Sequence, residues 1–154
     1  MNFSSFYKLF FENRELVGPV YHGGKWDGVS PIKMGRGALG TGAYFTPLRH
    51  KADMYAKENR GTISIAFLDI KNPLIIKTSN SNYSHPCVDA LIQLGVEPKK
   101  AKNLVEKVEE EKGYLGKEIS SRAIQQGYDA IFQYFVDVLY EIVIWNSDKV
   151  INKL

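Results

Sequence analysis

Three short segments of the chain combine polar or aromatic side chains with a β-type run beside glycine. They are YHGG at 21–24, GTGAYFT at 40–46 and YEIVIW at 140–145, and Tyr55 follows the second of them. Residue types of this kind suit the binding of a flat, polar ligand, because glycine lets the backbone approach closely and aromatic rings stack.

The individual side chains suggest a pocket for a pyridine–ribose group. His22, at a strand end before a glycine pair, can donate a hydrogen bond to a hydroxyl. Tyr44 and Tyr55 can face each other with a flat ring between them. Glu141 opens an otherwise apolar strand, where a carboxylate must be paired or face a cleft, and there it can stabilise a cation that forms on a sugar ring.

Each of these residues also has a structural interpretation. His22 can be a hydrogen-bonded strand-end residue, and Tyr44 and Tyr55 are two of nine tyrosines that can belong to the core. Glu141 can be an edge-strand charge that faces water. The single cysteine, Cys87, is interpreted as a small buried hydrophobe, and with His85 alone it offers too few ligands for a metal.

The periodicity and the breakers predict the elements that carry these residues. Aromatic residues at helical spacing predict an amphipathic helix at the N-terminus, within 1–16, that ends at Gly18-Pro19. Seven of the thirteen glycines lie within 23–42, which predicts a loop. Strands are expected at 20–22, 43–46, 62–70, 74–76, 129–132 and 139–145, and helices at 48–59, 86–112 and 118–126. This order indicates one α+β domain over 1–154, with a helical insertion at 86–126.

Composition excludes several classes of protein. The formal net charge is +3 and apolar residues make up 44% of the chain, as in ordinary globular proteins. No apolar stretch is long enough to span a membrane, and the N-terminus does not resemble a signal peptide. One cysteine and no leader predict a cytoplasmic protein.

Taken together in their order, the segments resemble the His-Tyr-Glu class of ADP-ribosyltransferases, which includes diphtheria toxin and the poly(ADP-ribose) polymerases. The Asn72-Pro73 pair after a β-type run and the GYD triplet at 127–129 are similar to the small phage and bacterial members. The resemblance covers about 20–150. It implies two small, mainly antiparallel sheets with flanking helices and a central cleft that takes NAD as substrate, with no metal.

The resemblance also implies roles for the residues of this chain. His22 would bind a ribose hydroxyl, and Gly23 would hold the nicotinamide carboxamide through its backbone. Tyr44 and Tyr55 would enclose the nicotinamide ring, and Glu141 would bind the ribose 2′-hydroxyl and stabilise the oxocarbenium-like transition state. Tyr21 and Phe45, in the same segments, complete the expected NAD-binding set.

Two positions depart from the pattern. Where the polymerases carry a serine three residues before the second tyrosine, this chain has Ala52. Leu139, two residues before Glu141, differs from the Glu or Gln of the arginine-specific class, which argues against an arginine acceptor.

The resemblance predicts mono-ADP-ribosylation of a protein acceptor. A phage origin would make that acceptor a host protein or defence complex in the host cytoplasm, so an anti-CRISPR role is one form of the hypothesis. An inactive module that binds NAD, ADP-ribose or a protein, and transfer to nucleic acid or a small molecule, stay open as alternatives. The oligomeric state is open as well.

Overall fold

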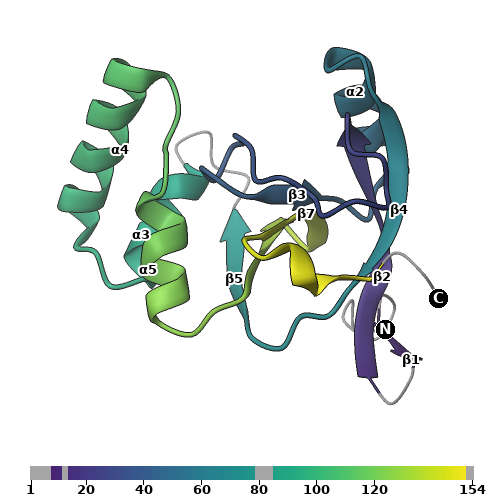
Figure 1. Cartoon of the computed structure of the whole chain (residues 1–154). Helices are drawn as coiled ribbons and strands as arrows, with labels where there is room; N and C mark the ends of the chain where they lie inside the picture. The colour runs from purple at the N-terminus through teal and green to yellow at the C-terminus, as the bar shows by residue number, and fades with distance from the viewer. Residues whose placement is uncertain (1–7, 12–13, 79–84, 152–154) are drawn as a thin grey trace.

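Two sheets form the frame of the protein in the computed structural model, which describes residues 8–11, 14–78 and 85–151 (Figure 1). Within these residues, each sheet has four strands. The first has the order β1 (Lys8–Phe11), β2 (Arg14–Gly24), β4 (Thr62–Leu68), β8 (Val150–Ile151). The second has the order β3 (Ala43–Phe45), β7 (Val138–Ile144), β6 (Ala130–Phe135), β5 (Pro73–Thr78).

The pairing of the strands is mainly antiparallel, as predicted. The β5–β6 pair is parallel, and the helices between these two strands make the crossover that a parallel pair needs. Alternate residues of β5 are buried, namely Leu74, Ile76 and Thr78, which is the period-2 pattern of a strand with one face in the core.

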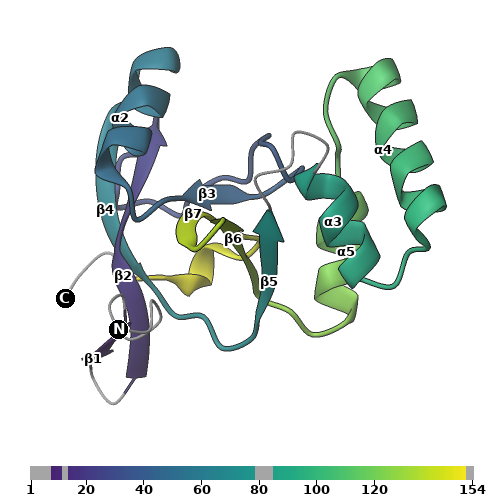
Figure 2. The ribbon, with the colours of Figure 1, turned by 180° about the vertical axis from the view of Figure 1, so that it is seen from behind.

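The helices lie at opposite ends of the molecule. The helix α2 (Arg49–Glu58) lies beside β2 and β4, and the other three gather at the far end (Figures 1 and 2). These are α3 (Pro86–Gln93), α4 (Pro98–Lys112) and α5 (Glu118–Gln125). Proline in the first turn begins both α3 and α4, and Gly113, with a φ of 77°, ends α4.

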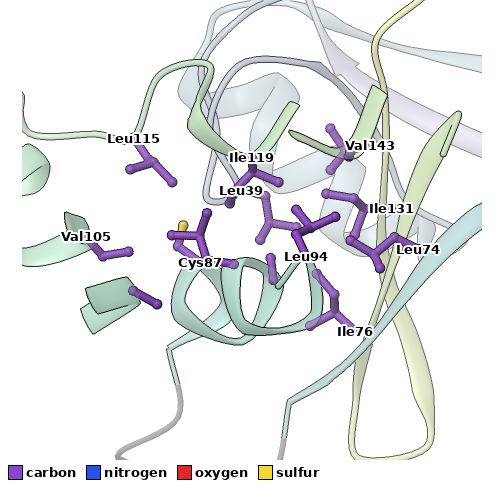
Figure 3. Packing of buried hydrophobic residues seen from close by; sticks show 14 residues of the cluster. Leu39, Leu74, Ile76, Cys87, Leu94, Val105, Leu115, Ile119, Ile131 and Val143 are labelled. Carbon is purple, nitrogen blue, oxygen red and sulfur yellow. The ribbon is translucent and has the colours of Figure 1, made fainter. Parts of the chain in front are cut away.

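The apolar side chains form two clusters, one on each face of the second sheet. One fills the space between the two sheets and includes Val20, Phe45, Leu68 and Ile142. The other joins the second sheet to α3, α4 and α5 and is shown in Figure 3. Cys87 belongs to the second cluster, where burial raises the pKa of its thiol to about 12. Cys87 is 1% exposed, so the interpretation of this residue as a small buried hydrophobe is confirmed.

The predicted N-terminal helix is wrong wherever the structure describes it. Residues 8–11 and 14–16 lie in β1 and β2, which pair antiparallel with Lys8 opposite Val17. Residues 1–7 and 12–13 lie outside the described residues. Aromatic and β-branched side chains also favour strands, and pairing with a neighbour decided between the two periods. The predicted stop at Gly18-Pro19 lies inside β2, at a register shift between Val17 and Val20.

The other predicted elements are confirmed with changes at their ends. The helical stretch expected at 86–112 consists of two helices, α3 and α4, and the second begins at Pro98, as the sequence indicates. A turn at Gly95 separates them. The short 3-10 helix η1 (Ser147–Lys149) and β8 were not predicted. In the part of the chain that the structure describes, no helix has the length and apolar character needed to cross a membrane.

Candidate active site

A cleft of about 1100 Å³ opens where the two sheets meet. Its walls come from the end of β2, the glycine-rich loop after it, β3, the C-terminal end of α2 and Glu141 in the middle of β7. The side chains that line the cleft include His22, Trp26, Tyr44, Tyr55 and Glu141, and the cations Lys25, Lys33, Arg36 and Arg60.

Backbone pairing between distant segments brings the three predicted motifs together. Tyr21 and Thr46 exchange two backbone hydrogen bonds of 2.8 and 2.9 Å, which join the end of β2 to the end of β3. The strand β3 then pairs with β7, with Tyr44 opposite Val143. His22 and Glu141 therefore line one cleft although 118 positions separate them in the sequence (141 − 22 − 1), and the prediction of a shared opening is confirmed.

His22 is oriented by the strand next to it. Its Nδ1 lies 2.7 Å from the Tyr44 carbonyl oxygen, so Nδ1–H is the donor and Nε2 is left as an acceptor. Burial lowers the pKa of His22, which favours the neutral imidazole, and the hydrogen bond with the Tyr44 carbonyl opposes this effect. In this tautomer the free ring nitrogen, Nε2, is an acceptor, and the role of His22 toward a ribose hydroxyl stays a prediction.

Glu141 is a buried acid with two polar neighbours. Its side chain is 3% exposed, and Oε1 lies 3.5 Å from Lys51 Nζ and 3.4 Å from the Tyr55 hydroxyl, which donates to it. Burial raises the pKa of Glu141, and Lys51 and Tyr55 pull it down. Burial also lowers the pKa of Lys51, to about 8, against the attraction of Glu141. The arrangement supplies a fixed carboxylate at the wall of the cleft.

Lys51 contacts Tyr140 as well as Glu141. Its Nζ donates to the Tyr140 carbonyl oxygen at 3.3 Å and lies 2.9 Å from the centre of the Tyr140 ring. These contacts satisfy a cation that is 5% exposed and stop it from leaving the carboxylate for water.

Tyr44 is locked in place by the glycine-rich loop. Its hydroxyl donates to the Gly40 carbonyl oxygen at 2.6 Å and accepts from the Leu39 amide at 2.9 Å. A Cβ atom at Gly37 would overlap the Tyr44 ring, so only glycine fits there. Burial raises the pKa of Tyr44 and also that of Tyr55, so both phenols are neutral.

Five of the predicted site residues line the cleft, and two do not. His22, Gly23, Tyr44, Tyr55 and Glu141 are part of its wall. The remaining two are Tyr21, whose ring lies 5.6 Å from the Arg49 guanidinium, and Phe45. Phe45 is 1% exposed and packs against the His22 and Trp26 rings, so it supports the site from behind.

Gly23 also has a packing role that the sequence did not reveal. A Cβ atom there would overlap the backbone carbonyl of Ala52, so glycine lets α2 lie directly on β2. Ala52 is completely buried under this contact and does not line the cleft. The serine that the polymerases carry at this position therefore has no counterpart at the cleft wall.

Sequence reasoning missed Lys51 and the cationic side of the cleft. Lys51 precedes Tyr55 by four residues, so helical spacing alone places both on one face of α2. Four cations, Lys25, Lys33, Arg36 and Arg60, line the cleft beside Trp26. Three of them lie among the loop glycines, and that clustering was a signal for a phosphate-binding wall.

Comparison with known families agrees with this geometry. Residues 16–150 match the model of a family described as ADP-ribosyltransferase in polyvalent proteins. No curated protein and no solved structure shows significant similarity to the chain. Because the family match covers all three motifs and most of the chain, the chain belongs to the ADP-ribosyltransferases, a family that uses NAD as its substrate.

Proposed function

We propose that this protein is a mono-ADP-ribosyltransferase that transfers ADP-ribose from NAD to a protein acceptor. The observation that carries the proposal is Glu141, a buried carboxylate paired with Lys51 and Tyr55 at the wall of the cleft that also holds His22. A buried charge of this kind is costly to a fold, and such sites are commonly functional.

The residues suit the chemistry of that transfer. The bond between the ribose C1′ and the nicotinamide nitrogen breaks with its electron pair going to nicotinamide, which leaves as a neutral ring. Positive charge develops on the ribose, and the acceptor nucleophile then bonds to C1′ and loses its proton. The Glu141 carboxylate stabilises that positive charge without having to reorganise.

The remaining residues position the donor. His22 Nε2 accepts a hydrogen bond from a ribose hydroxyl, and the Tyr44 and Tyr55 rings flank the nicotinamide. Cations that line the cleft, including Arg36 and Arg60, offer charge-assisted hydrogen bonds to the pyrophosphate.

A surface beside Glu141 supports a protein acceptor. The β6–β7 hairpin exposes Phe135, Val136 and Val138 at 48%, 44% and 53%, a few residues before the acid. Val136 also has a φ of 57°, which is rare for a β-branched residue. An exposed apolar group of this kind marks a surface that contacts another macromolecule more often than one that recognises a small polar substrate.

The substitution Glu141→Gln tests the proposal because it keeps the shape of the side chain and removes its charge. Labelled NAD and cell lysate are mixed with each variant, and labelled protein, free nicotinamide and NAD affinity are measured. We expect the rates of transfer and NAD hydrolysis to fall by about 10²-fold, with NAD affinity nearly unchanged, because the charge on the ribose develops only in the transition state.

Glu110→Gln on the exposed face of α4 is the matched control and is expected to act like the wild type. Wild-type rates in Glu141→Gln would refute the mechanism. NAD binding by the wild type with no labelled product and no released nicotinamide would instead support a binding module.

A further inference from the structure

We propose that His85, Cys87 and Glu109 form a binding site for a zinc-like divalent metal ion where α3 meets α4. The potential ligand atoms of these three side chains all lie within 4.8 Å of one another. His85 Nε2 is 3.0 Å from Glu109 Oε1. Two of the residues are adjacent in sequence to the start of α3, and Glu109 comes from the last turn of α4.

The geometry is close to what a tetrahedral ion requires. Zinc bonds of about 2.0–2.3 Å place ligand atoms roughly 3.3–3.8 Å apart. The longest distance between the ligand atoms must therefore shorten by about 1 Å, and rotation of the partly exposed His85 and Glu109 side chains can supply this. His85 and Glu109 are each 41% exposed, so an ion can enter from solvent and keep a water as its fourth ligand.

The donor set selects the kind of metal. A thiolate, an imidazole and a carboxylate together suit zinc and cobalt, whereas calcium and magnesium prefer oxygen alone. The cluster is held by packed elements, because Cys87 and Val105, from α3 and α4, share one apolar cluster (Figure 3). A metal at this point would tie the two helices together.

The hydrogen bonds at the site change when the metal enters. His85 Nδ1 accepts from the Cys87 amide at 3.1 Å, so Nε2 carries the proton that points to Glu109. A metal on Nε2 takes the place of that proton, which moves to Nδ1, so Nδ1 no longer accepts from the Cys87 amide and the ring turns away from it. The Cys87 thiol releases its proton to solvent and gives up its bond to the Ala38 carbonyl oxygen.

The alternative to a metal site is a purely structural cluster, in which His85 bonds Glu109 and the Cys87 thiol bonds the Ala38 carbonyl oxygen. The substitution Cys87→Ser separates these interpretations, because serine retains a donor for Ala38 and removes the soft ligand. Glu109→Gln, at the surface, separates them without a change in the core.

Cobalt titration of the full-length, chelator-treated protein tests the site. We expect one Co²⁺ per chain, with the near-ultraviolet absorption of a thiolate–cobalt bond, and displacement of Co²⁺ by Zn²⁺. The absorption should be absent in Cys87→Ser. Co²⁺ affinity should fall at least ~10-fold in Glu109→Gln and in His85→Gln, since even outer-shell groups contribute about 10–100-fold.

Two controls leave the cluster intact, Glu110→Gln beside it and His50→Gln on α2, and both should bind cobalt as the wild type does. The proposal is overturned if the wild type shows no thiolate–cobalt absorption, or if the absorption persists with unchanged affinity in Glu109→Gln and His85→Gln. None of these measurements involves NAD, so they are independent of the proposed transferase activity.

Discussion

The buried pair of Lys51 and Glu141 is the feature that most distinguishes this cleft from ordinary surface. Both side chains are at most 5% exposed, and their charged atoms are 3.5 Å apart. Burial raises the pKa of the acid and lowers that of the amine, and in each case the charge of the partner opposes the effect of burial.

Lys51→Met should therefore shift the pH dependence of the reaction. Without the Lys51 cation, nothing but Tyr55 offsets the effect of burial, so the pKa of Glu141 rises further. The active carboxylate then forms only at higher pH, and the acid limb of the rate profile moves upward. We expect the rate at pH 6, relative to that at pH 8, to fall by about ten-fold more than in the wild type.

The rate of NAD hydrolysis, measured from pH 5.5 to 8.5, shows this shift in the acid limb of the profile directly. Lys57→Met is the control, because Lys57 lies on the same helix but is exposed and paired with Asp53 at the surface. A rate that falls equally at all pH values in Lys51→Met would show that Lys51 acts by packing and not by its charge.

The glycine-rich loop after β2 packs against the Tyr44 ring and bonds its hydroxyl. Gly35 and Gly37 both line the cleft, but they differ in what surrounds them. A Cβ atom at Gly37 would overlap the Tyr44 ring, and one at Gly35 would meet nothing within 4 Å. The pair allows the position of the ring to be tested inside one loop.

Gly37→Ala should displace the Tyr44 ring and break its bonds to Leu39 and Gly40. We expect NAD affinity to fall by about ten-fold, which corresponds to roughly 1.4 kcal/mol, about one net hydrogen bond. Gly35→Ala should stay within about two-fold of the wild type, well under 1 kcal/mol. Calorimetric titration of both variants with NAD makes the comparison, and equal affinities would remove Tyr44 from the binding site.

The β6–β7 hairpin should control the acceptor and not the donor. Phe135→Ser removes an exposed ring that lies 6.5 Å from Tyr140, beside the acid. We expect protein labelling to fall by about ten-fold, since one truncated interface anchor commonly costs 1–2 kcal/mol or more, with NAD hydrolysis unchanged. Ile124→Ser, at an equally exposed apolar residue of α5, is the control. A parallel loss of both activities would place Phe135 in the support of Glu141.

The two sheets are joined by polar contacts as well as by the core between them. Asp129, just before β6, accepts from the backbone amides of Lys71 and Asn72 in the segment that links β4 to β5, at 2.7 and 2.9 Å. It is also 3.3 Å from Lys149, just before β8 of the first sheet. One carboxylate thus holds three segments of the chain at the junction.

Asp129→Ala should destabilise the whole protein by about 2 kcal/mol, because hydrogen bonds to charged groups are worth about 1.5–3 kcal/mol each. Burial raises the pKa of Asp129, but the two amides and Lys149 outweigh it and lower the pKa below 3.8. The folded carboxylate therefore contributes stability above pH 3.8 and loses it as the pH falls through the lowered pKa.

Urea unfolding at pH 7 and at pH 3 measures the difference. The difference in the free energy of unfolding between the wild type and Asp129→Ala should be largest at pH 7 and should become smaller toward low pH. Asp53→Ala, which removes a surface pair on α2, should change the free energy of unfolding by only about 0.5 kcal/mol. A gap that does not depend on pH would mean that the Asp129 charge is not involved.

Local sequence was sufficient for the elements whose signals are local. The proline and glycine boundaries of α4, the alternation in β5 and the apolar run of β7 all depend on neighbours within a few residues. The order of the three motifs also identified the family, because spacing along the chain does not depend on how the strands pair.

The composition of the cleft wall depended on contacts between segments far apart in sequence. Adjacent residues of a strand point to opposite faces, so whether Tyr21 or His22 faced the cleft depended on which strands pair with β2. Lys51 gained its role from Glu141, 90 positions later (141 − 51). Residues 8–11 and 14–16 became strand because β1 and β2 pair. A periodic pattern specifies which side chains share a face, and only tertiary packing specifies what that face meets.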